Sequence, residues 1–358
     1  MTSFYSLVVA DLTRETKDCV SIAFDVPEDL KEKFNYLPGQ YLTLKLFVKG
    51  EEIRRSYSVC SCAMMNEKLR VAIKKVKNGK GSVHINESVK VGDTIEVMTP
   101  MGNFHSPLNA TNKKNYVLFA GGSGITPMMS IIKSVLLTEP NSKLILFYGN
   151  ENEDAIIFKK QLDELAASNA TRLELFHILN KPTTATSIDF NGIMDVVKNK
   201  LLLSKYVDLN SDNEYFICGP TGMMDSVMAA LKENSIDKTK IHIEYFSSPE
   251  NISSETQTDT SANFVASELT IICDGDEIQL NLKPGETVLE AALAANIDAP
   301  YACQGGSCCT CRAKLVEGKV HMKVNYALLD SEVEEGFILT CQSQALSPKL
   351  IVDYDRGR

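Results

Sequence analysis

The most chemically informative feature of the chain is a group of cysteines near its C-terminus. Cys303, Cys308 and Cys311 are spaced C-x4-C-x2-C, and Cys341 stands 30 positions further on. Four cysteines at this spacing are typical of a [2Fe–2S] cluster, in which each iron takes two sulfurs from the protein. Buried or disulfide-forming cysteines are the alternative interpretation. The two glycines that follow Gln304 favour the cluster, because they let the backbone curl and point N–H groups at sulfur.

Two glycine-rich turns carry a second kind of chemistry. The apolar run 116–120 leads into Gly121-Gly-Ser-Gly-Ile-Thr-Pro, and the run 214–217 leads into Cys218-Gly-Pro-Thr-Gly. A turn between a strand and a helix presents unpaired N–H groups and the positive end of the helix dipole, which favour an anion. Ligands of open parallel sheets bind at the carboxyl ends of the strands. Two such turns therefore favour a dinucleotide site, although a plain tight turn would read similarly.

A third candidate segment lies nearer the N-terminus and reads Arg55-Ser-Tyr57-Ser58. An arginine can neutralise a phosphate, a tyrosine can lie against a flat ring, and a serine hydroxyl can bond to a ring nitrogen. Taken alone, a segment of this kind is most often just a strand. Its value depends on the motifs that accompany it.

Stretches of different periodicity must position these residues. Residues 1–110 alternate short apolar runs with turns, for example at 41–48 and 69–76, and the period of two predicts an antiparallel sheet or barrel. Residues 111–246 contain continuous apolar runs separated by helix-like stretches, one of them at 154–167, which predicts a parallel α/β sheet. These runs lie at 116–120, 143–149, 173–179 and 214–219.

A change of composition separates the cysteine segment from the rest. Residues 247–267 are rich in Ser, Thr, Asn and acidic side chains and contain few large apolar ones, so we expect a flexible linker. Residues 268–358 then form a domain of their own around the cysteines. The sequence therefore predicts a multidomain chain with boundaries near residues 110, 246 and 267.

Composition excludes several classes of function. The chain has 358 residues and a net charge of −9, and no basic tract suggests nucleic acid. No run approaches the ~20 apolar residues that a membrane helix needs. The N-terminal residues carry no signal-peptide pattern. Ten cysteines beside an iron–sulfur motif fit a reducing cytoplasm better than a disulfide framework.

Taken together, the motifs resemble a known family. Arg55-Ser-Tyr57-Ser58, then Gly79-Lys-Gly81-Ser82, then the two glycine turns, in that order, resemble the ferredoxin–NADP reductase superfamily, and the C-terminal segment is similar to a plant-type ferredoxin. Their fusion resembles the reductase components of multicomponent oxygenases, most closely those of the phenylacetyl-CoA epoxidase type. The resemblance implies an antiparallel β-barrel for the flavin, an α/β parallel sheet for the pyridine nucleotide and an α+β β-grasp ferredoxin domain.

The resemblance also implies roles for residues near the flavin. Arg55 would hold the flavin phosphate, Tyr57 would stack on the isoalloxazine, and Ser58 would approach its N5 atom. Gly81 and Ser82 would meet the pyrophosphate of FAD. The Pro38-Gly-Gln-Tyr41 turn also matches the barrel of the family.

For the remaining cofactors the implied residues fall into three groups. Thr126 would lie near the nicotinamide, Cys218 beside its C4 atom, and Glu244 and Phe246 at the border of the flavin ring. The nucleotide-binding set is Gly121, Gly122, Gly124, Thr126, Cys218, Gly219 and Pro220. The catalytic set is Tyr57, Ser58, Cys218 and Glu244, and the cluster ligands are Cys303, Cys308, Cys311 and Cys341.

Two departures from the family pattern concern ligand choice. Cys309 stands where relatives have a small residue, and we interpret it as a spare residue beside the cluster. Glu151, Glu153 and Asp154 would repel a 2′-phosphate and favour NADH, whereas Lys181 stands where relatives often bind that phosphate. NADH and NADPH both remain open.

The resemblance implies an NAD(P)H-dependent oxidoreductase. A hydride would pass to FAD, and single electrons would then pass to the [2Fe–2S] cluster and on to an oxygenase component. The alternative is a general electron-transfer reductase serving a ferredoxin, a haem protein or a flavodiiron protein. A redox-sensing or binding module without flavin is a third hypothesis, which the intact Arg55, Tyr57, Ser58 and Cys218 disfavour.

Overall fold

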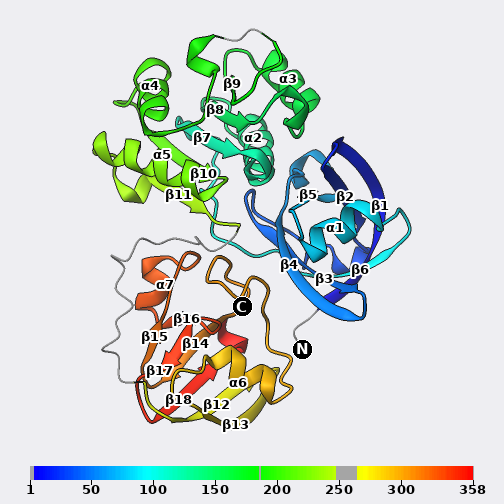
Figure 1. The fold of residues 1–358 in the computed structure, drawn as a ribbon, viewed down its shortest axis with the longest axis vertical. Coiled ribbons are helices and arrows are strands. Elements are labelled where there is room, and N and C mark those ends of the chain that lie inside the picture. Colours follow the sequence, from blue (N-terminus) through cyan, green and yellow to red (C-terminus); the bar gives the residue numbers. More distant parts are fainter. Residues whose placement is uncertain (1–3, 185–186, 247–263, 358) are drawn as a thin grey trace.

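The computed structural model describes residues 4–184, 187–246 and 264–357. These residues form three successive units: the barrel domain (β1 to β6), the parallel-sheet domain (β7 to β11) and the C-terminal domain (β12 to β18) (Figure 1). Residues 247–263 of the predicted linker lie outside the described residues. Ser267, its last residue, is the first residue of β12.

The barrel domain is a six-stranded sheet in which every named pair of strands is antiparallel, in the order β4-β3-β6-β1-β2-β5. Leu42, Leu44 and Leu46 of β3 point into its core, as the period of two predicts. A single helix, α1, follows β5. The elements are β1 Phe4–Thr16, β2 Cys19–Asp25, β3 Tyr41–Val48, β4 Glu51–Ser58, β5 Leu69–Lys74, α1 Lys80–Glu87 and β6 Thr94–Met98.

The parallel-sheet domain has the strand order β11-β10-β7-β8-β9, with every neighbouring pair parallel. Side chains of α2 and α3 pack on one face of the sheet and those of α4 and α5 on the other, which explains why its strands are continuously apolar. The strands are β7 Asn115–Gly121, β8 Lys143–Asn150, β9 Leu173–Leu179, β10 Asn213–Cys218 and β11 Ile241–Glu244. The helices are α2 Ile125–Thr138, α3 Lys159–Ser168, α4 Val196–Tyr206 and α5 Thr221–Glu233.

Two predicted boundaries differ from the structure. The helix expected at 154–167 begins only at Lys159, because Phe158 takes a left-handed φ of +62° and buries its ring together with the two preceding isoleucines. Asp154 lies instead in a short 3-10 turn, Glu153–Ala155. The strand expected at 69–76 ends at Lys74, and the chain then turns toward α1.

The C-terminal domain has a mixed five-stranded sheet in the order β13-β12-β18-β14-β16, with β12 and β18 parallel, and a two-stranded sheet of β15 and β17. Helix α6 begins at a capping box in which Thr287 and Glu290 satisfy each other's backbone N–H groups. The strands are β12 Ser267–Cys273, β13 Asp276–Leu282, β14 Arg312–Glu317, β15 Val320–Met322, β16 Phe337–Leu339, β17 Ser343–Ala345 and β18 Lys349–Asp353. The helices are α6 Val288–Ala294 and α7 Asp330–Glu334.

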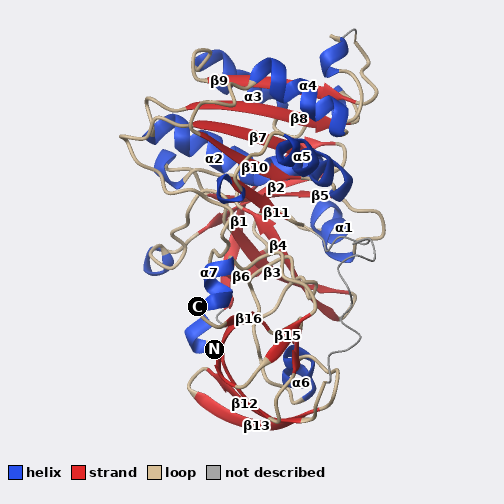
Figure 2. Ribbon diagram, turned by 90° about the vertical axis from the view of Figure 1, so that its left-hand side faces the viewer, coloured by secondary structure: helices blue, strands red, loops and turns tan. Residues whose placement is uncertain are grey.

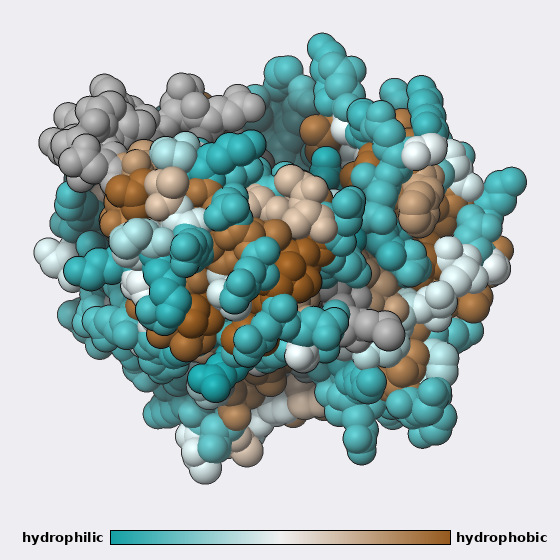
Figure 3. All heavy atoms as spheres, turned by 90° about the horizontal axis from the view of Figure 1, so that it is seen from below, coloured by the Kyte–Doolittle hydropathy of each residue, from teal (hydrophilic) through white to brown (hydrophobic). Residues whose placement is uncertain are grey.

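The barrel domain contacts both of the other domains. The parallel-sheet domain lies at one end of the molecule and the C-terminal domain at the other, with barrel strands β3 and β4 between them (Figure 2). Charged and polar side chains cover much of the end formed by the C-terminal domain, with apolar groups between them (Figure 3). Among the described residues, none of the helices has the length and apolar character needed to cross a bilayer.

Candidate active site and cluster site

The carboxyl ends of four parallel strands bring the predicted nucleotide and catalytic residues to one edge. Cys218, at the end of β10, pairs with Ala120 of β7 on one side and with Glu244 of β11 on the other. On the far side of β7, Gly121 pairs with Gly149 of β8. Residues that lie far apart in the sequence therefore stand side by side where ligands of open parallel sheets bind.

The two glycine turns at this edge pack directly on each other. A Cβ atom on Gly124 would lie 2.0 Å from the carbonyl oxygen of Cys218, and one on Gly219 would lie 2.9 Å from the backbone nitrogen of Gly121. A Cβ on Gly121 would lie 2.6 Å from Cδ of Pro220. These glycines are required because no side chain fits between the turns. The contact carries the backbone of both turns to the wall of one groove.

That groove has a volume of about 590 Å³ and runs along the edge of the parallel sheet. Lys74 reaches it from the barrel domain, and Glu151 and Asn180 line its far end. Gly121, Gly122 and Pro220 belong to its wall. Gly222 also lines it, whereas Gly124, Thr126, Cys218 and Gly219 do not. Gly124 lies beneath the Cys218 carbonyl, and the buried Thr126 hydroxyl donates a hydrogen bond to the Ser123 carbonyl oxygen at 3.0 Å.

The flavin residues expected from the sequence come together on strand β4 and helix α1. Where a side chain of Gly81 would stand, the nearest atoms include Cγ of Arg55 at 3.5 Å and Oη of Tyr57 at 3.6 Å. Arg55 is exposed. The buried Ser82 hydroxyl accepts a hydrogen bond from the Val76 N–H at 3.1 Å, so it is already engaged in the loop before α1. A guanidinium beside a helix with Gly79 as its N-cap and Gly81 in its first turn suits a phosphate group.

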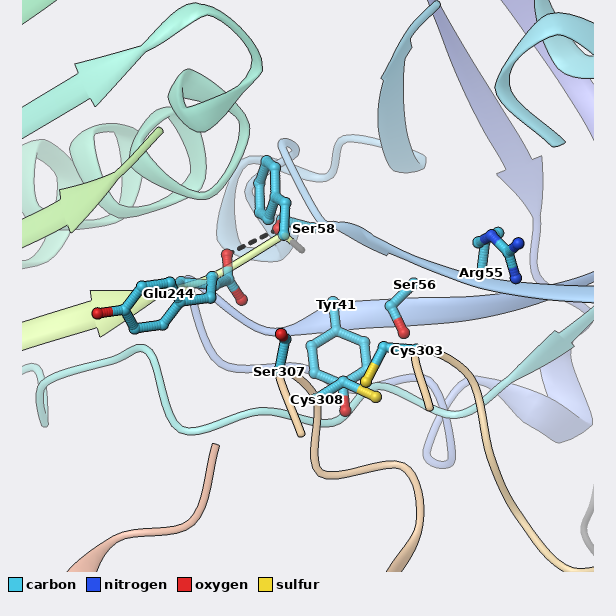
Figure 4. A pocket seen from close by; sticks show the side chains of 10 residues that line it. Tyr41, Arg55, Ser56, Ser58, Glu244, Cys303, Ser307 and Cys308 are labelled. Atoms are coloured by element: carbon cyan, nitrogen blue, oxygen red, sulfur yellow. Dashed lines mark hydrogen bonds between the residues drawn. The ribbon is translucent and has the colours of Figure 1, made fainter. Parts of the chain in front are cut away.

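Ser58 and Glu244 meet in a second cavity, of about 260 Å³. The Ser58 hydroxyl donates to a Glu244 carboxylate oxygen at 2.9 Å, as the dashed line in Figure 4 marks. Burial raises the pKa of Glu244 to about 8, against the opposing effect of the Ser58 hydrogen bond. Burial also raises the pKa of the neighbouring Cys218 thiol well above its ordinary value. The cavity is therefore lined by a carboxyl that is mostly protonated at pH 7, and the neutral Cys218 thiol lies buried next to that residue in the sheet.

The same cavity reaches the cysteines of the C-terminal domain. Its lining includes Ser58 and Glu244 on one side and Cys303 and Cys308 on the other, with Tyr41 between them (Figure 4). Phe246, which is 44% exposed, also lines it. One cavity thus connects the expected flavin residues to the expected cluster ligands.

The four expected cluster ligands form two pairs. Interaction with the Cys308 thiol lowers the pKa of Cys303 to about 6, and interaction with the Cys311 thiol lowers the pKa of Cys341. All four are free cysteines. In the described part of the chain no group of three or more His, Cys, Asp or Glu side chains could hold a single metal ion. Two pairs of thiols instead suit two irons that take two sulfurs each.

Backbone and side-chain N–H groups surround these sulfurs, as the cluster hypothesis expects. The Gly305 N–H donates to the Cys303 sulfur at 3.4 Å, and the Gln342 amide donates to the Cys341 sulfur at 3.4 Å. Gly306 takes a left-handed φ of +74°, which a side chain would strain. Donors aimed at sulfur favour the thiolate form that iron requires.

Residues outside the predicted catalytic and ligand sets connect the barrel to the C-terminal domain: Tyr41, Arg54 and Cys309. Cys309 is buried, belongs to neither thiol pair and donates its N–H to the Tyr41 hydroxyl at 3.1 Å. Arg54, beside the predicted Arg55, is also buried and contacts the C-terminal domain. The only sequence signal for Arg54 was the pair of adjacent arginines on a strand, which must point to opposite faces.

Comparison with known families assigns each domain. Residues 6–106 match the oxidoreductase FAD-binding domain, residues 118–229 the oxidoreductase NAD-binding domain, and residues 271–346 the 2Fe-2S iron-sulfur cluster binding domain. These matches confirm the three predicted cofactors, FAD, a pyridine nucleotide and a [2Fe–2S] cluster. The chain has an FAD-binding barrel, an NAD-binding parallel sheet and an iron–sulfur domain, as predicted.

Whole-chain relatives share this organisation. The chain is 38% identical to a subunit of 1,2-phenylacetyl-CoA epoxidase from Escherichia coli strain K12, over 99% of both chains. It is 33% identical to the ferredoxin reductase component of 3-ketosteroid-9-alpha-monooxygenase from Rhodococcus rhodochrous, over 97% of this chain and 96% of the other. Phthalate dioxygenase reductase has a similar fold, with a TM-score of 0.56, 24% identity and coverage of 98% of both chains. The chain therefore belongs to the ferredoxin–NADP reductase-like oxidoreductases with a C-terminal [2Fe–2S] domain, the reductase components of multicomponent oxygenases.

Proposed function

We propose that this reductase supplies an oxygenase of the phenylacetyl-CoA epoxidase type with electrons from NAD(P)H. The observation that carries the proposal is the single cavity lined by Ser58 and Glu244 on one side and by Cys303 and Cys308 on the other. It joins the hydride-accepting site to the cluster without an intervening domain. When bound, the flavin accepts a hydride and releases single electrons, and the cluster carries one electron at a time.

On the flavin side, strand β4 supplies the binding groups. The exposed Arg55 neutralises the flavin phosphate, and Gly81 leaves room for it beside α1. Ser82 acts through the loop that its hydroxyl closes. Tyr57 lies against the flavin ring, and Ser58 offers its hydroxyl to a ring nitrogen in place of Glu244.

On the nucleotide side, the residues divide into wall and support. Gly121, Gly122 and Pro220 form a wall without bulky side chains, so the pyrophosphate can approach the backbone closely. Gly219 packs against Gly121 beneath this wall. Gly124 and Thr126 act beneath the surface, by letting the two turns pack. Cys218 presents a neutral thiol, and Phe246 covers the cavity.

At the cluster, we propose that Cys303 and Cys308 bind one iron and that Cys311 and Cys341 bind the other. The effect of each thiol on the pKa of the other member of its pair supports this division. We also propose the domain boundaries 1–110, 111–246 and 268–358. Ten cysteines without a disulfide among them support a reducing, cytoplasmic location.

The partner is proposed from the relatives. Identity of 38% along nearly the whole of both chains favours the epoxidase type. The 33% identity to a monooxygenase reductase component supports an oxygenase partner more generally. The alternative is a general electron-transfer reductase that serves a ferredoxin, a haem protein or a flavodiiron protein. A coupled assay with purified candidate acceptors distinguishes them: the true partner is reduced at a rate that saturates with its concentration.

Substitution of two adjacent cysteines tests whether electrons reach the partner through the cluster. Cys308→Ser removes an expected ligand and should abolish electron transfer to the partner while ferricyanide, which takes electrons from flavin, is still reduced. Cys309→Ser is the matched control and should retain about two irons per chain, because its thiol lies outside both pairs. Iron analysis and both assays check this. Zinc instead of iron in the purified chain, or loss of both activities in Cys308→Ser, would refute the proposal.

A further inference from the structure

Strand β4 presents its two faces to two different domains. Arg55 and Tyr57 face α1, where they surround Gly81. Arg54 and Ser56 lie on the opposite face of the strand, because successive side chains alternate. That face is covered by the C-terminal domain, and Arg54 is only 6% exposed. The strand expected to hold the flavin is therefore also the strand on which the cluster domain rests.

Arg54 is the centre of the first contact between the two domains. Its guanidinium donates to an Asp298 carboxylate oxygen at 2.9 Å and to the Ala299 carbonyl oxygen at 3.3 Å, and it stacks over the Tyr301 ring at 4.4 Å. Glu52 holds it from within the strand at 2.7 Å. The three partner positions lead directly into Cys303. A planar group with several donors makes all these contacts at once, which lysine would not.

A second contact lies on the other side of the cysteines. The Thr310 hydroxyl hydrogen-bonds with the Thr43 hydroxyl at 3.2 Å and with the Tyr41 hydroxyl at 3.1 Å. Thr43 in turn reaches Ser56 of β4 at 3.2 Å. All but Ser56 are buried, so breaking these bonds would leave polar groups without partners. The cysteine loop is thus held to the barrel both before Cys303 and after Cys308.

We propose that Arg54 and Thr43 are positioning residues for electron transfer within the chain, an inference that rests on the proposed function. They seat the cluster loop on the flavin strand at a fixed separation across the shared cavity. Neither side chain lines that cavity. Their loss leaves the hydride site intact and lets the C-terminal domain move away from the barrel. Polar contacts between domains permit such motion unless specific bonds restrain it.

The kinetic test uses the fully loaded protein under anaerobic stopped-flow conditions. Arg54→Gln and Thr43→Val should each slow cluster reduction by about tenfold while the rate of flavin reduction by NAD(P)H and ferricyanide reduction stay unchanged. Asp298→Asn, on an exposed side chain, should act in the same direction. The Arg54→Gln/Asp298→Asn double variant should reduce the cluster no more slowly than Arg54→Gln alone, because both substitutions remove the same Arg54–Asp298 interaction. Lys349→Gln, which breaks an ion pair with Glu317 inside the C-terminal domain, is the control.

A structural readout separates positioning from any change in the cofactors. Hydrogen exchange of the peptide 303–312 should be faster in Arg54→Gln and Thr43→Val than in the wild type and in Lys349→Gln, because the Cys309 amide loses its Tyr41 partner as the domain lifts. Flavin and iron contents are measured first. If the wild type contained neither, the proposed function would be contradicted, and not the positioning role of Arg54 and Thr43. With both present, cluster reduction within about twofold of wild type in all three single variants, or unchanged exchange, would overturn the inference.

Discussion

Burial holds the Glu244 carboxyl in a protonation state that few carboxyls share at neutral pH. Its pKa is raised to about 8, so it is mainly neutral at pH 7 and ionised at pH 9. The folded chain holds this proton more tightly than the unfolded chain. The group therefore lowers the free energy of unfolding as pH rises from about 5 to about 8.

This state predicts a pH dependence for hydride transfer. Ionised Glu244 would oppose the arrival of negative charge at Ser58, so the rate of flavin reduction should fall as pH rises through about 8. Glu244→Gln stays neutral and should show a flat profile. Stopped-flow reduction from pH 6 to about 9.5 measures both. The same decline in the variant and the wild type would assign the titration to another group.

The ion pair between Glu151 and Lys181 predicts which coenzyme is preferred. Glu151 accepts a hydrogen bond from the Lys181 ammonium at 2.8 Å, which lowers the pKa of the carboxyl and keeps it ionised. We expect a preference for NADH, because Lys181 is occupied and Glu151 repels a 2′-phosphate. Glu151→Gln should raise kcat/KM for NADPH about tenfold and leave NADH nearly unchanged. Glu233→Gln, in a surface ion pair of the same domain, should change neither.

At the scale of elements, the two strand-to-helix turns act as one unit. Gly124 precedes α2 and has an ordinary helical φ of −62°, so alanine could adopt this backbone conformation. There is, however, no room for its Cβ atom. The Cys218 carbonyl oxygen fills that space. Gly222, in the first turn of α5, has no neighbouring atom within 4 Å of a Cβ position.

These two glycines form a matched pair for mutagenesis. Gly124→Ala should lower the free energy of unfolding by about 1–3 kcal/mol or more and weaken pyridine-nucleotide binding, because the turns must separate. Gly222→Ala should raise it by about 0.5–1 kcal/mol, since alanine is the better helix former. Denaturant unfolding and nucleotide titration measure the two effects. Equal stability of the two variants would show that the turns do not depend on this contact.

At the scale of the whole molecule, charge is unevenly distributed between the domains. Residues 268–358 contain 14 acidic and 8 basic side chains, a net charge of −6, whereas residues 1–110 carry a net charge of +2. The Arg54–Asp298 pair is one place where the two meet. An acidic cluster domain should attract a partner with a basic docking face, and salt weakens such attraction.

This distribution predicts that the two ends of the electron route respond differently to salt. Reduction of the partner should slow as salt rises through about 0.1–0.5 M, while hydride transfer to the flavin should change little. Stopped-flow records of both steps in the same salt series test this, with sucrose at matched viscosity as the control. An equal response of both steps, or none in the partner step, would reject the electrostatic account.

Much of this molecule could be predicted from local sequence. The spacing of four cysteines, two glycine turns after apolar runs and the change from period-two to continuous apolar runs are all short-range signals. The cluster, the pyridine nucleotide and the fold class that they predicted are confirmed, as is FAD, which the family resemblance predicted. The end of β5 and the start of helix α3 were predicted wrongly. The start of α3 depends on buried Phe158, which tertiary packing holds in a left-handed conformation.

Other properties depend on residues that meet only after folding. Ser58 and Glu244 bond across 186 positions, and the pKa of Glu244 follows from burial that no local pattern records. Alternation along β3 would turn Thr43 toward solvent, yet it is 1% exposed because the C-terminal domain covers it. The sequence by itself determined which chemistry the chain carries, since that rests on residue type and spacing. Only the tertiary structure decided how the domains face each other, because that depends on contacts between Arg54, Thr43 and a segment about 250 residues away.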